Sequence, residues 1–207
     1  MKVKICGITD LPTAKVAIQY GADAIGFVFA HSKRKITPQK AKEIINQLPK
    51  NLLKVGVFVN EEKEKINEII EETGINVIQL HGDESPQLSE SFTLPIIKAF
   101  SIQTEVDLEK ISEYTCEYVL LDSPKGKYRG GNGVAFDWAI LSNHKITAPK
   151  IILAGGLTTE NVIQGMELVN PYMVDVSSGV ESDGKKDLRK IKEFIETVKH
   201  YKGEEVH

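Results

Sequence analysis

Residues 3–9, VKICGIT, decide how this chain folds, because they combine a first strand with a sharp exit from it. The run begins as a short, mostly apolar strand, and Cys6 stands where that strand should end. Gly7 can adopt a positive φ without steric cost, so the chain can turn directly after the thiol. Cys6 therefore faces whatever site the strand ends build, although a lone cysteine is more often a buried structural residue.

Seven further apolar runs, rich in β-branched residues, follow along the chain. Most are almost continuously hydrophobic, which is typical of strands that are buried on both faces in a parallel sheet covered by helices. Including the first run, the predicted strands are residues 3–6, 24–29, 53–59, 76–80, 96–100, 118–122, 150–154 and 173–177.

Helical patterns separate these strands. Thr37 and Pro38 have the form of an N-cap followed by proline at the first helical position, and Gly74 ends another pattern as a C′ glycine. Val106 and Leu188 are expected to face inward from two of these helices. The predicted helices are residues 12–20, 38–48, 61–73, 85–92, 104–114, 159–168 and 187–201, with a loop at 124–133 and a short helix from Phe136.

Strands that alternate with helices in this way indicate parallel βαβ units. Eight units predict a (β/α)8 TIM barrel, and 207 residues lie close to the lower limit of about 200 for that fold. A doubly wound open sheet is the alternative, but the first strand leads into CGITD and not into the G-x-G-x-x-G fingerprint. Since no linker marks a boundary, we expect residues 1–207 to form a single domain.

The composition is that of an ordinary globular protein, with 41% hydrophobic and 27% charged residues and a net charge of -3. It predicts no surface for nucleic acid or for membranes, and no apolar run approaches the roughly 18 residues of a spanning helix. Cys6 and Cys116 do not resemble a disulfide framework, and no signal peptide is apparent, so a cytoplasmic location is expected. Metal-ligand spacings such as HExxH and CxxC are missing.

The turns after the seventh and eighth predicted strands have the composition of an anion site. Gly155-Gly156 and Ser178-Gly179 should expose backbone N–H groups with little obstruction from side chains. Barrels often bind phosphate in these loops, at a helix N-terminus. Glycine and serine are also common turn residues, but their presence after both strands favours phosphate binding.

Three further polar residues stand at strand ends. Asp122 follows an apolar strand, where a carboxylate costs free energy unless it is paired; it suits a general acid, and its alternative role is to cap the next loop. The guanidinium of Arg34 can bind a substrate carboxylate through two parallel N–H groups; alternatively, Arg34 is a solvated charge between Lys33 and Lys35. His81 either binds substrate or orients a neighbour, and no carboxylate partner lies at motif spacing.

Seven segments carry a resemblance to a known family. In chain order they are KICGIT, SKR, QLHG, LLDS, GGNGVAFDW, LAGGL and VDVSSGVE. Together, over essentially the whole chain, they closely resemble phosphoribosylanthranilate isomerases of tryptophan biosynthesis. Asn132 stands where the family usually has Thr or Ser, and Lys35 where an aromatic or apolar residue is common. Neither departure involves the acid or the base.

The resemblance implies an Amadori rearrangement of N-(5-phosphoribosyl)anthranilate to 1-(2-carboxyphenylamino)-1-deoxyribulose 5-phosphate. The family's general base falls on Cys6, its general acid on Asp122 and its carboxylate-binding arginine on Arg34; its phosphate loops fall on Gly155-Gly156 and residues 177–179. No cofactor is implied, because the iminium intermediate serves as the electron sink. The expected partner is one small phosphorylated substrate, and the chain is expected to be a monomer or a homodimer.

A cysteine base must act as the thiolate, whereas a free cysteine has a pKa of about 8.5. We expect Lys4, or the backbone dipoles at the strand end, to favour the thiolate of Cys6.

Two rival functions remain at this stage. Another enzyme on a phosphate-binding barrel, such as an indole-glycerol-phosphate synthase or a sugar-phosphate epimerase, would need a Lys–Glu pair or metal-ligating His and Asp residues at the strand ends, and neither set is evident. A non-catalytic phospholigand-binding protein is the other, and it would bind ligand without turnover.

Overall fold

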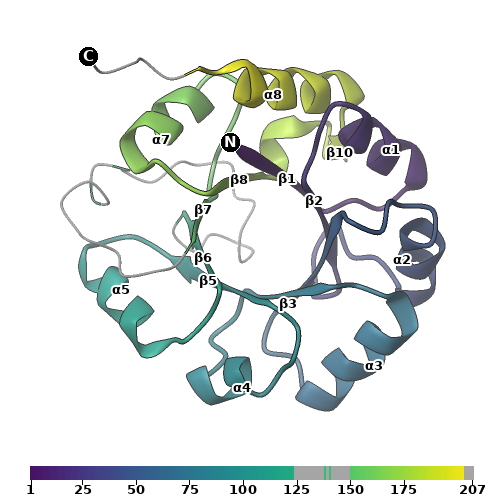
Figure 1. The fold of residues 1–207 in the computed structure, drawn as a ribbon, viewed down its shortest axis with the longest axis vertical. Helices are drawn as coiled ribbons and strands as arrows, with labels where there is room; N and C mark the ends of the chain where they lie inside the picture. The colour runs from purple at the N-terminus through teal and green to yellow at the C-terminus, as the bar shows by residue number, and fades with distance from the viewer. Residues whose placement is uncertain (124–137, 139, 141–149, 203–207) are drawn as a thin grey trace.

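The computed structural model describes residues 1–123, 138, 140 and 150–202. Its centre is a closed barrel of parallel strands in sequential order, in which β8 pairs with β1 (Figure 1). This arrangement confirms the predicted (β/α)8 barrel and excludes the open sheet. The strands are β1 (Lys2–Cys6), β2 (Ala24–Val28), β3 (Leu53–Phe58), β4 (Val77–Leu80), β5 (Ile96–Ser101), β6 (Tyr118–Asp122), β7 (Ile151–Leu153) and β8 (Met173–Val176).

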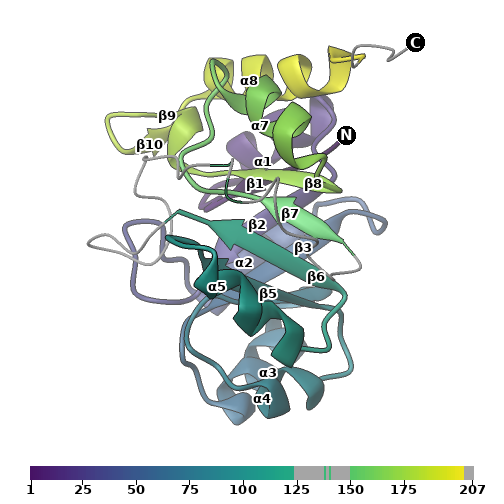
Figure 2. The same ribbon diagram turned by 90° about the vertical axis from the view of Figure 1, so that its left-hand side faces the viewer.

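Helices surround the barrel (Figure 1). They are α1 (Leu11–Gln19), α2 (Pro38–Ile45), α3 (Lys63–Thr73), α4 (Pro86–Glu90), α5 (Val106–Glu109), α7 (Val162–Val169) and α8 (Leu188–His200), with single 3₁₀ turns η1 (Lys110–Glu113) and η2 (Ser178–Val180). A small hairpin, β9 (Glu181–Ser182) and β10 (Lys185–Lys186), follows η2 and lies at the end of the molecule where the barrel strands finish (Figure 2). None of the helices in the described part of the chain is long and apolar enough to cross a membrane.

The helix starts follow the local chemistry of the sequence. The Thr37 side chain accepts a hydrogen bond from the backbone N–H of Lys40, which confirms it as the N-cap of α2. Asp187 caps α8 in the same way, accepting from the backbone N–H of Arg189. At the C-terminal end of α3, Gly74 has a φ of 76° and ends the helix, as expected.

Alternate residues of each strand face the inside of the barrel, because successive side chains of a strand point to opposite faces. On β6, Tyr118 and Leu120 belong to the inner apolar cluster, so Asp122, two residues on, points inward as well. On β1, Cys6 belongs to the same cluster, and Lys4 shares its face. At the carboxyl ends of the strands, isolated polar side chains therefore lie together in one layer, next to the inner apolar cluster.

Two helix predictions are wrong in detail. The segment predicted as one helix, 104–114, is split into the short α5 and a 3₁₀ turn, and Val106 is 62% exposed because so short a helix covers little of the barrel. Leu188 is 43% exposed, since it is the first residue of α8 and precedes the turns that pack on the barrel. The predicted loop 124–133, with Asn132, and the start of the short helix at Phe136 lie outside the described residues.

Candidate active site

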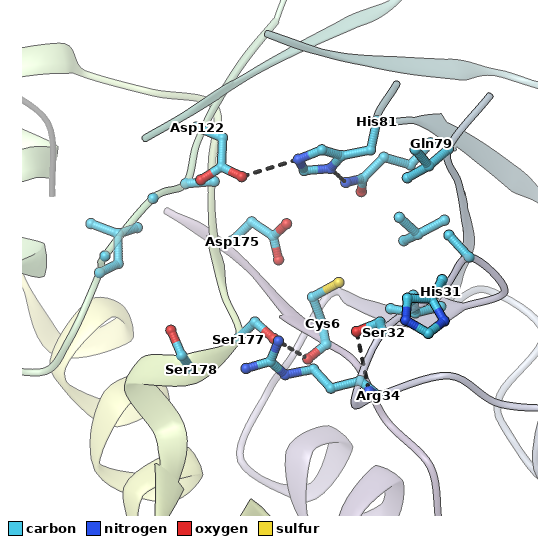
Figure 3. Close-up of a pocket in the computed structure, with 18 residues that line it drawn as sticks. Cys6, His31, Ser32, Arg34, Gln79, His81, Asp122, Asp175, Ser177 and Ser178 are labelled. Atoms are coloured by element: carbon cyan, nitrogen blue, oxygen red, sulfur yellow. Dashed lines mark hydrogen bonds and ion pairs between the residues drawn. The ribbon is translucent and has the colours of Figure 1, made fainter. Parts of the chain in front are cut away.

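A cavity of about 350 Å³ lies at the carboxyl ends of the strands (Figure 3). Its walls are partly apolar, with Val28, Val57 and Leu157 among the lining residues. Every predicted site residue except Gly179 lines it: Cys6, Arg34, His81, Asp122, Gly155, Gly156, Ser177 and Ser178. Residues far apart in the sequence thus meet in one pocket, on the face where barrel enzymes place their chemistry.

Cys6 is buried at the end of β1, and its position depends on a neighbouring glycine. A Cβ atom on Gly26 of β2 would lie 2.8 Å from the Cys6 Sγ atom, so only glycine leaves room for the thiol here. Gly7 has a φ of 80°, and the aliphatic stem of Arg34 packs where a Cβ of Gly7 would be. The VKICGIT stretch therefore places both the thiol and the arginine.

Lys4 and Asp175 form a buried ion pair beneath Cys6. Lys4 is fully buried, and its Nζ donates to Asp175 Oδ2 at 2.6 Å. Burial raises the pKa of the Cys6 thiol and the Asp175 charge adds to this, while Lys4 and Lys186 act in the opposite direction. The prediction that Lys4 favours the thiolate is right in sign, but burial outweighs it. Burial therefore favours the thiol form of Cys6.

Asp122 lies at the end of a hydrogen-bonded chain of side chains. Its Oδ2 atom is 3.0 Å from His81 Nε2, and His81 Nδ1 is 2.8 Å from Gln79 Nε2 (Figure 3). If the Gln79 amide donates to Nδ1, the ring proton lies on Nε2 and points at Asp122. The other carboxylate oxygen, Oδ1, accepts from the Ser123 backbone N–H at 2.8 Å, so Asp122 also takes part in a local cap.

This chain of contacts gives His81 the carboxylate partner that motif spacing did not offer. Asp122 is 41 residues away in sequence, and the two side chains meet because β4 and β6 both pair with β5 and end on the same side of the barrel. Gln79 is 1% exposed on β4, and it was not among the predicted site residues. An isolated polar residue at an inward position of an apolar strand is the signal that could have identified it.

Arg34 is held by a carboxylate and is not a solvated charge. Its Nε donates to Glu181 Oε1 at 2.6 Å and its Nη2 to Glu181 Oε2 at 2.8 Å. Lys186 Nζ also donates to Glu181 Oε1, at 2.6 Å. Burial alone would raise the pKa of Glu181, but hydrogen bonds from Arg34 and Lys186 hold it below its usual value. Sequence reasoning assigned no role to Glu181 or Lys186.

The two predicted anion loops lie against each other. Gly155 and Gly156 have φ values of 78° and 65°, and within the described residues their backbone N–H groups donate to no backbone carbonyl. Asn161 fixes the loop by donating to the Gly156 carbonyl at 3.0 Å. Gly179 packs against the carbonyl of Leu157, which explains why it does not itself line the cavity. Small residues are needed here for close packing as well as for access to a ligand.

Two buried oxygens in the cavity have no hydrogen-bond partner in the described structure. They are Gln79 Oε1 and Asp175 Oδ1, and both side chains line the pocket. A buried acceptor without a partner costs free energy, so such atoms indicate places where a ligand can donate hydrogen bonds. Among the described residues, no group of His, Cys, Asp and Glu could hold a metal ion.

Comparison with known proteins assigns the family. The family model for N-(5'phosphoribosyl)anthranilate (PRA) isomerase matches residues 3–197. The chain is 55% identical over 196 residues to N-(5'-phosphoribosyl)anthranilate isomerase from Bacillus cereus (strain Q1), covering 94% of this chain and 96% of the relative.

Solved structures agree with this assignment. Phosphoribosyl anthranilate isomerase from Thermotoga maritima superimposes with a TM-score of 0.89 at 41% identity, covering 96% of this chain and 98% of that one, and that enzyme is described as dimeric. A phosphoribosyl anthranilate isomerase in complex with reduced 1-(o-carboxyphenylamino)-1-deoxyribulose 5-phosphate superimposes with a TM-score of 0.85 at 40% identity. The match covers 96% of this chain and 98% of that one. On this evidence the chain belongs to the family of N-(5'-phosphoribosyl)anthranilate isomerases.

Proposed function

We propose that the chain catalyses the Amadori rearrangement of its family, with Cys6 as the general base and Asp122 as the general acid. The reaction converts N-(5'-phosphoribosyl)anthranilate into 1-(2-carboxyphenylamino)-1-deoxyribulose 5-phosphate. The observation that carries this assignment is the placement of the thiol and the carboxyl group on β1 and β6, in separate parts of one cavity (Figure 3). A sugar bound between them could lose a proton on one side and gain one on the other.

The acid step opens the ribose ring. A carboxyl group donates its proton to the ring oxygen, the C1′–O bond breaks, and the anthranilate nitrogen forms a Schiff base with C1′. Asp122 suits this role because it is 3% exposed and is held from two sides, by His81 at Oδ2 and by the Ser123 N–H at Oδ1. Fixed orientation keeps the carboxyl group in position for proton transfer to the ring oxygen.

His81 and Gln79 act through Asp122. If the Gln79 amide turns over, its Oε1 accepts from His81 Nδ1–H, and His81 Nε2 then accepts a hydrogen bond from the protonated Asp122 carboxyl group. The same three side chains can in this way hold either the carboxylate or the acid. We assign His81 a positioning role on this basis, in addition to the contact with substrate that its place in the cavity allows.

The base step removes the C2′ proton of the Schiff base and gives an enaminol, which becomes the ketone product. Cys6 performs this step as the thiolate. Because burial raises the pKa of its thiol, turnover should increase as the pH rises into the alkaline range. The positive charges of Lys4 and Lys186 partly offset the effect of burial and so enlarge the thiolate fraction.

The remaining cavity residues match the substrate's polar groups. The 5-phosphate would bind at Gly155, Gly156 and the loop 177–179, and the anthranilate carboxylate at Arg34. The unpartnered Asp175 Oδ1 would accept a hydrogen bond from a ribose hydroxyl group. Anionic groups at both ends of a sugar account for the two separate anion sites.

The test is a fluorescence assay, since the substrate fluoresces and its conversion removes the signal. The wild-type protein should abolish the fluorescence catalytically. A phospholigand-binding protein would bind the reduced product analogue without turnover, and that result would refute the proposed function.

We also propose that residues 1–207 form one domain, that the protein is a monomer or a homodimer, and that it works in the cytoplasm. The single closed barrel that ends in α8 supports the first point. The dimeric relative from Thermotoga maritima is compatible with the second, and the free thiols of Cys6 and Cys116 with the third.

A further inference from the structure

Three alternating charges form a continuous chain at the edge of the cavity. Arg34 donates to both carboxylate oxygens of Glu181, and Lys186 Nζ donates to Glu181 Oε1 at 2.6 Å. Lys190 reaches only the backbone carbonyl of Glu181, at 2.9 Å, and not its carboxylate. The chain therefore consists of two cations that share one anion, with a net charge of +1.

Only one member of the chain faces the cavity. Arg34 lines it, whereas Glu181 and Lys186 are not among the described lining residues. The side chains of Arg34, Glu181 and Lys186 are 17%, 9% and 5% exposed, so solvent screens their charges weakly. Glu181 engages Nε and Nη2 of Arg34, and Nη1 makes no contact with it, so the guanidinium keeps donors for a ligand.

An Arg–Glu pair alone is a poor attractor for an anion, because the carboxylate cancels the charge of the guanidinium and repels a second carboxylate. A second cation on the same carboxylate offsets this repulsion. Lys186 supplies it, because its Nζ donates to the same Glu181 oxygen as Arg34 Nε, and Lys186 also donates to the Ser177 carbonyl at 2.8 Å and the Ser177 hydroxyl at 3.2 Å. The fixed geometry means that its charge is in position before any ligand arrives.

We propose that Lys186 supplies the net positive charge of the carboxylate subsite, while Glu181 fixes the orientation in which Arg34 presents its free donors. Both are positioning residues that act through Arg34, and the idea rests on the proposed function in that Arg34 receives the anthranilate carboxylate. Lys186 also contacts Ser177 of the phosphate loop, so a role in phosphate binding is the competing explanation.

Ligand binding separates the two explanations better than turnover, because Lys186 also influences the Cys6 thiol. The probes are the reduced product analogue, the same compound without its ring carboxyl group, and inorganic phosphate. Their dissociation constants are measured by calorimetry for wild type, Lys186→Met and Lys186→Arg. Lys185→Met is the matched control, since Lys185 lies on the same short strand β10 and is exposed.

Lys186→Met should weaken the carboxylate-bearing analogue roughly ten- to fiftyfold more than the compound without the carboxyl group, the effect on one carboxylate of a unit charge about 7–12 Å away at an effective dielectric constant of about 20. Both compounds carry the 5-phosphate, so the ratio of their affinities cancels any effect of Lys186 on the phosphate loop, and inorganic phosphate measures that effect separately. Lys186→Arg should retain most of the preference for the carboxylate-bearing analogue. Lys185→Met should bind all three probes as tightly as wild type does.

A second variant guards against a folding defect. In the Lys186→Met, Glu181→Gln double variant the subsite regains its net charge of +1, so part of the lost affinity for the carboxylate should return. Equal weakening of all three probes, unchanged binding, or no recovery in the double variant would each overturn the assignment. Wild-type turnover, measured in the same preparations, tests the proposed function separately.

Discussion

Replacing Lys4 by Met tests how the fold controls the Cys6 thiol, the proposed general base. Lys4 is fully buried, and methionine fills a similar volume without a charge. The variant leaves Asp175 as a buried carboxylate, because Oδ2 loses its bond to Lys4 Nζ and Oδ1 has no partner among the described residues. Breaking a buried ion pair on one side costs roughly 3–5 kcal/mol. For a chain of this size each kcal/mol lowers Tm by about 2–4 °C, so a fall of roughly 6–20 °C is expected.

The same substitution should shift the pH dependence of turnover. It removes a charge that lowers the pKa of the Cys6 thiol, while burial and the Asp175 charge, which raise it, remain. A base works when deprotonated, so kcat/KM increases as the pH rises through the pKa of Cys6 in the folded protein. In the wild-type protein, kcat/KM should rise at a pH above the ordinary pKa of a thiol. In Lys4→Met, the same rise should occur at a still higher pH.

The assay combines thermal unfolding with the fluorescence decay of the substrate, followed from neutral to alkaline pH. Lys2→Met is the control, because it removes the same charge from β1 but does not act on Cys6. The double variant Lys4→Met, Asp175→Asn should recover much of the lost Tm, since neither side chain of the pair is then charged. A lower Tm with an unmoved pH profile would remove Lys4 from control of the thiol, and an unchanged Tm would contradict the energetic argument.

Three further outcomes are expected. Cys6→Ser should lower kcat by about 10²–10⁴-fold with little change in KM, because the smaller hydroxyl fits beside Gly26 but is a far weaker base; kcat close to wild type would exclude Cys6. Arg34→Ala should raise KM by roughly 10- to 150-fold, the worth of a charge-assisted pair of about 1.5–3 kcal/mol, and a loss confined to kcat would argue against carboxylate binding. Inorganic phosphate should inhibit competitively through Gly155 and Gly156, and crystals soaked in it that leave these loops empty would contradict that site.

The barrel could be predicted from the sequence because most of its strands are almost continuous apolar runs. The β2 run, for example, is buried at every residue, as a strand between helices and an apolar interior must be. Helix predictions failed where local pattern and tertiary contact disagree. Val106 fits a helical period, but it begins a helix of one turn that covers little surface, so it remains exposed.

The site could be predicted in part, because residues at strand ends share one face of a barrel whatever their distance in sequence. That rule found Cys6, Asp122 and the glycine turns. It missed Gln79 and Asp175, which lie inside strands, since an isolated polar residue in an apolar run gives no sign of which face it occupies until the register is known. The ionic partners of Arg34 were beyond reach for a different reason: Glu181 is 147 residues away, and only closure of β1 on β8 brings them together.

The central claim is that Asp122 delivers the proton that opens the ribose ring, and Asp122→Asn tests it most directly. The amide can still accept from the Ser123 N–H, so the cavity should keep its shape, but it cannot donate a carboxyl proton. Turnover of N-(5'-phosphoribosyl)anthranilate is measured beside the dissociation constant of the reduced product analogue. We predict that the variant binds the analogue with an affinity close to that of wild type while turnover falls by at least about 10²-fold. Retained turnover would contradict the account and remove Asp122 from the mechanism.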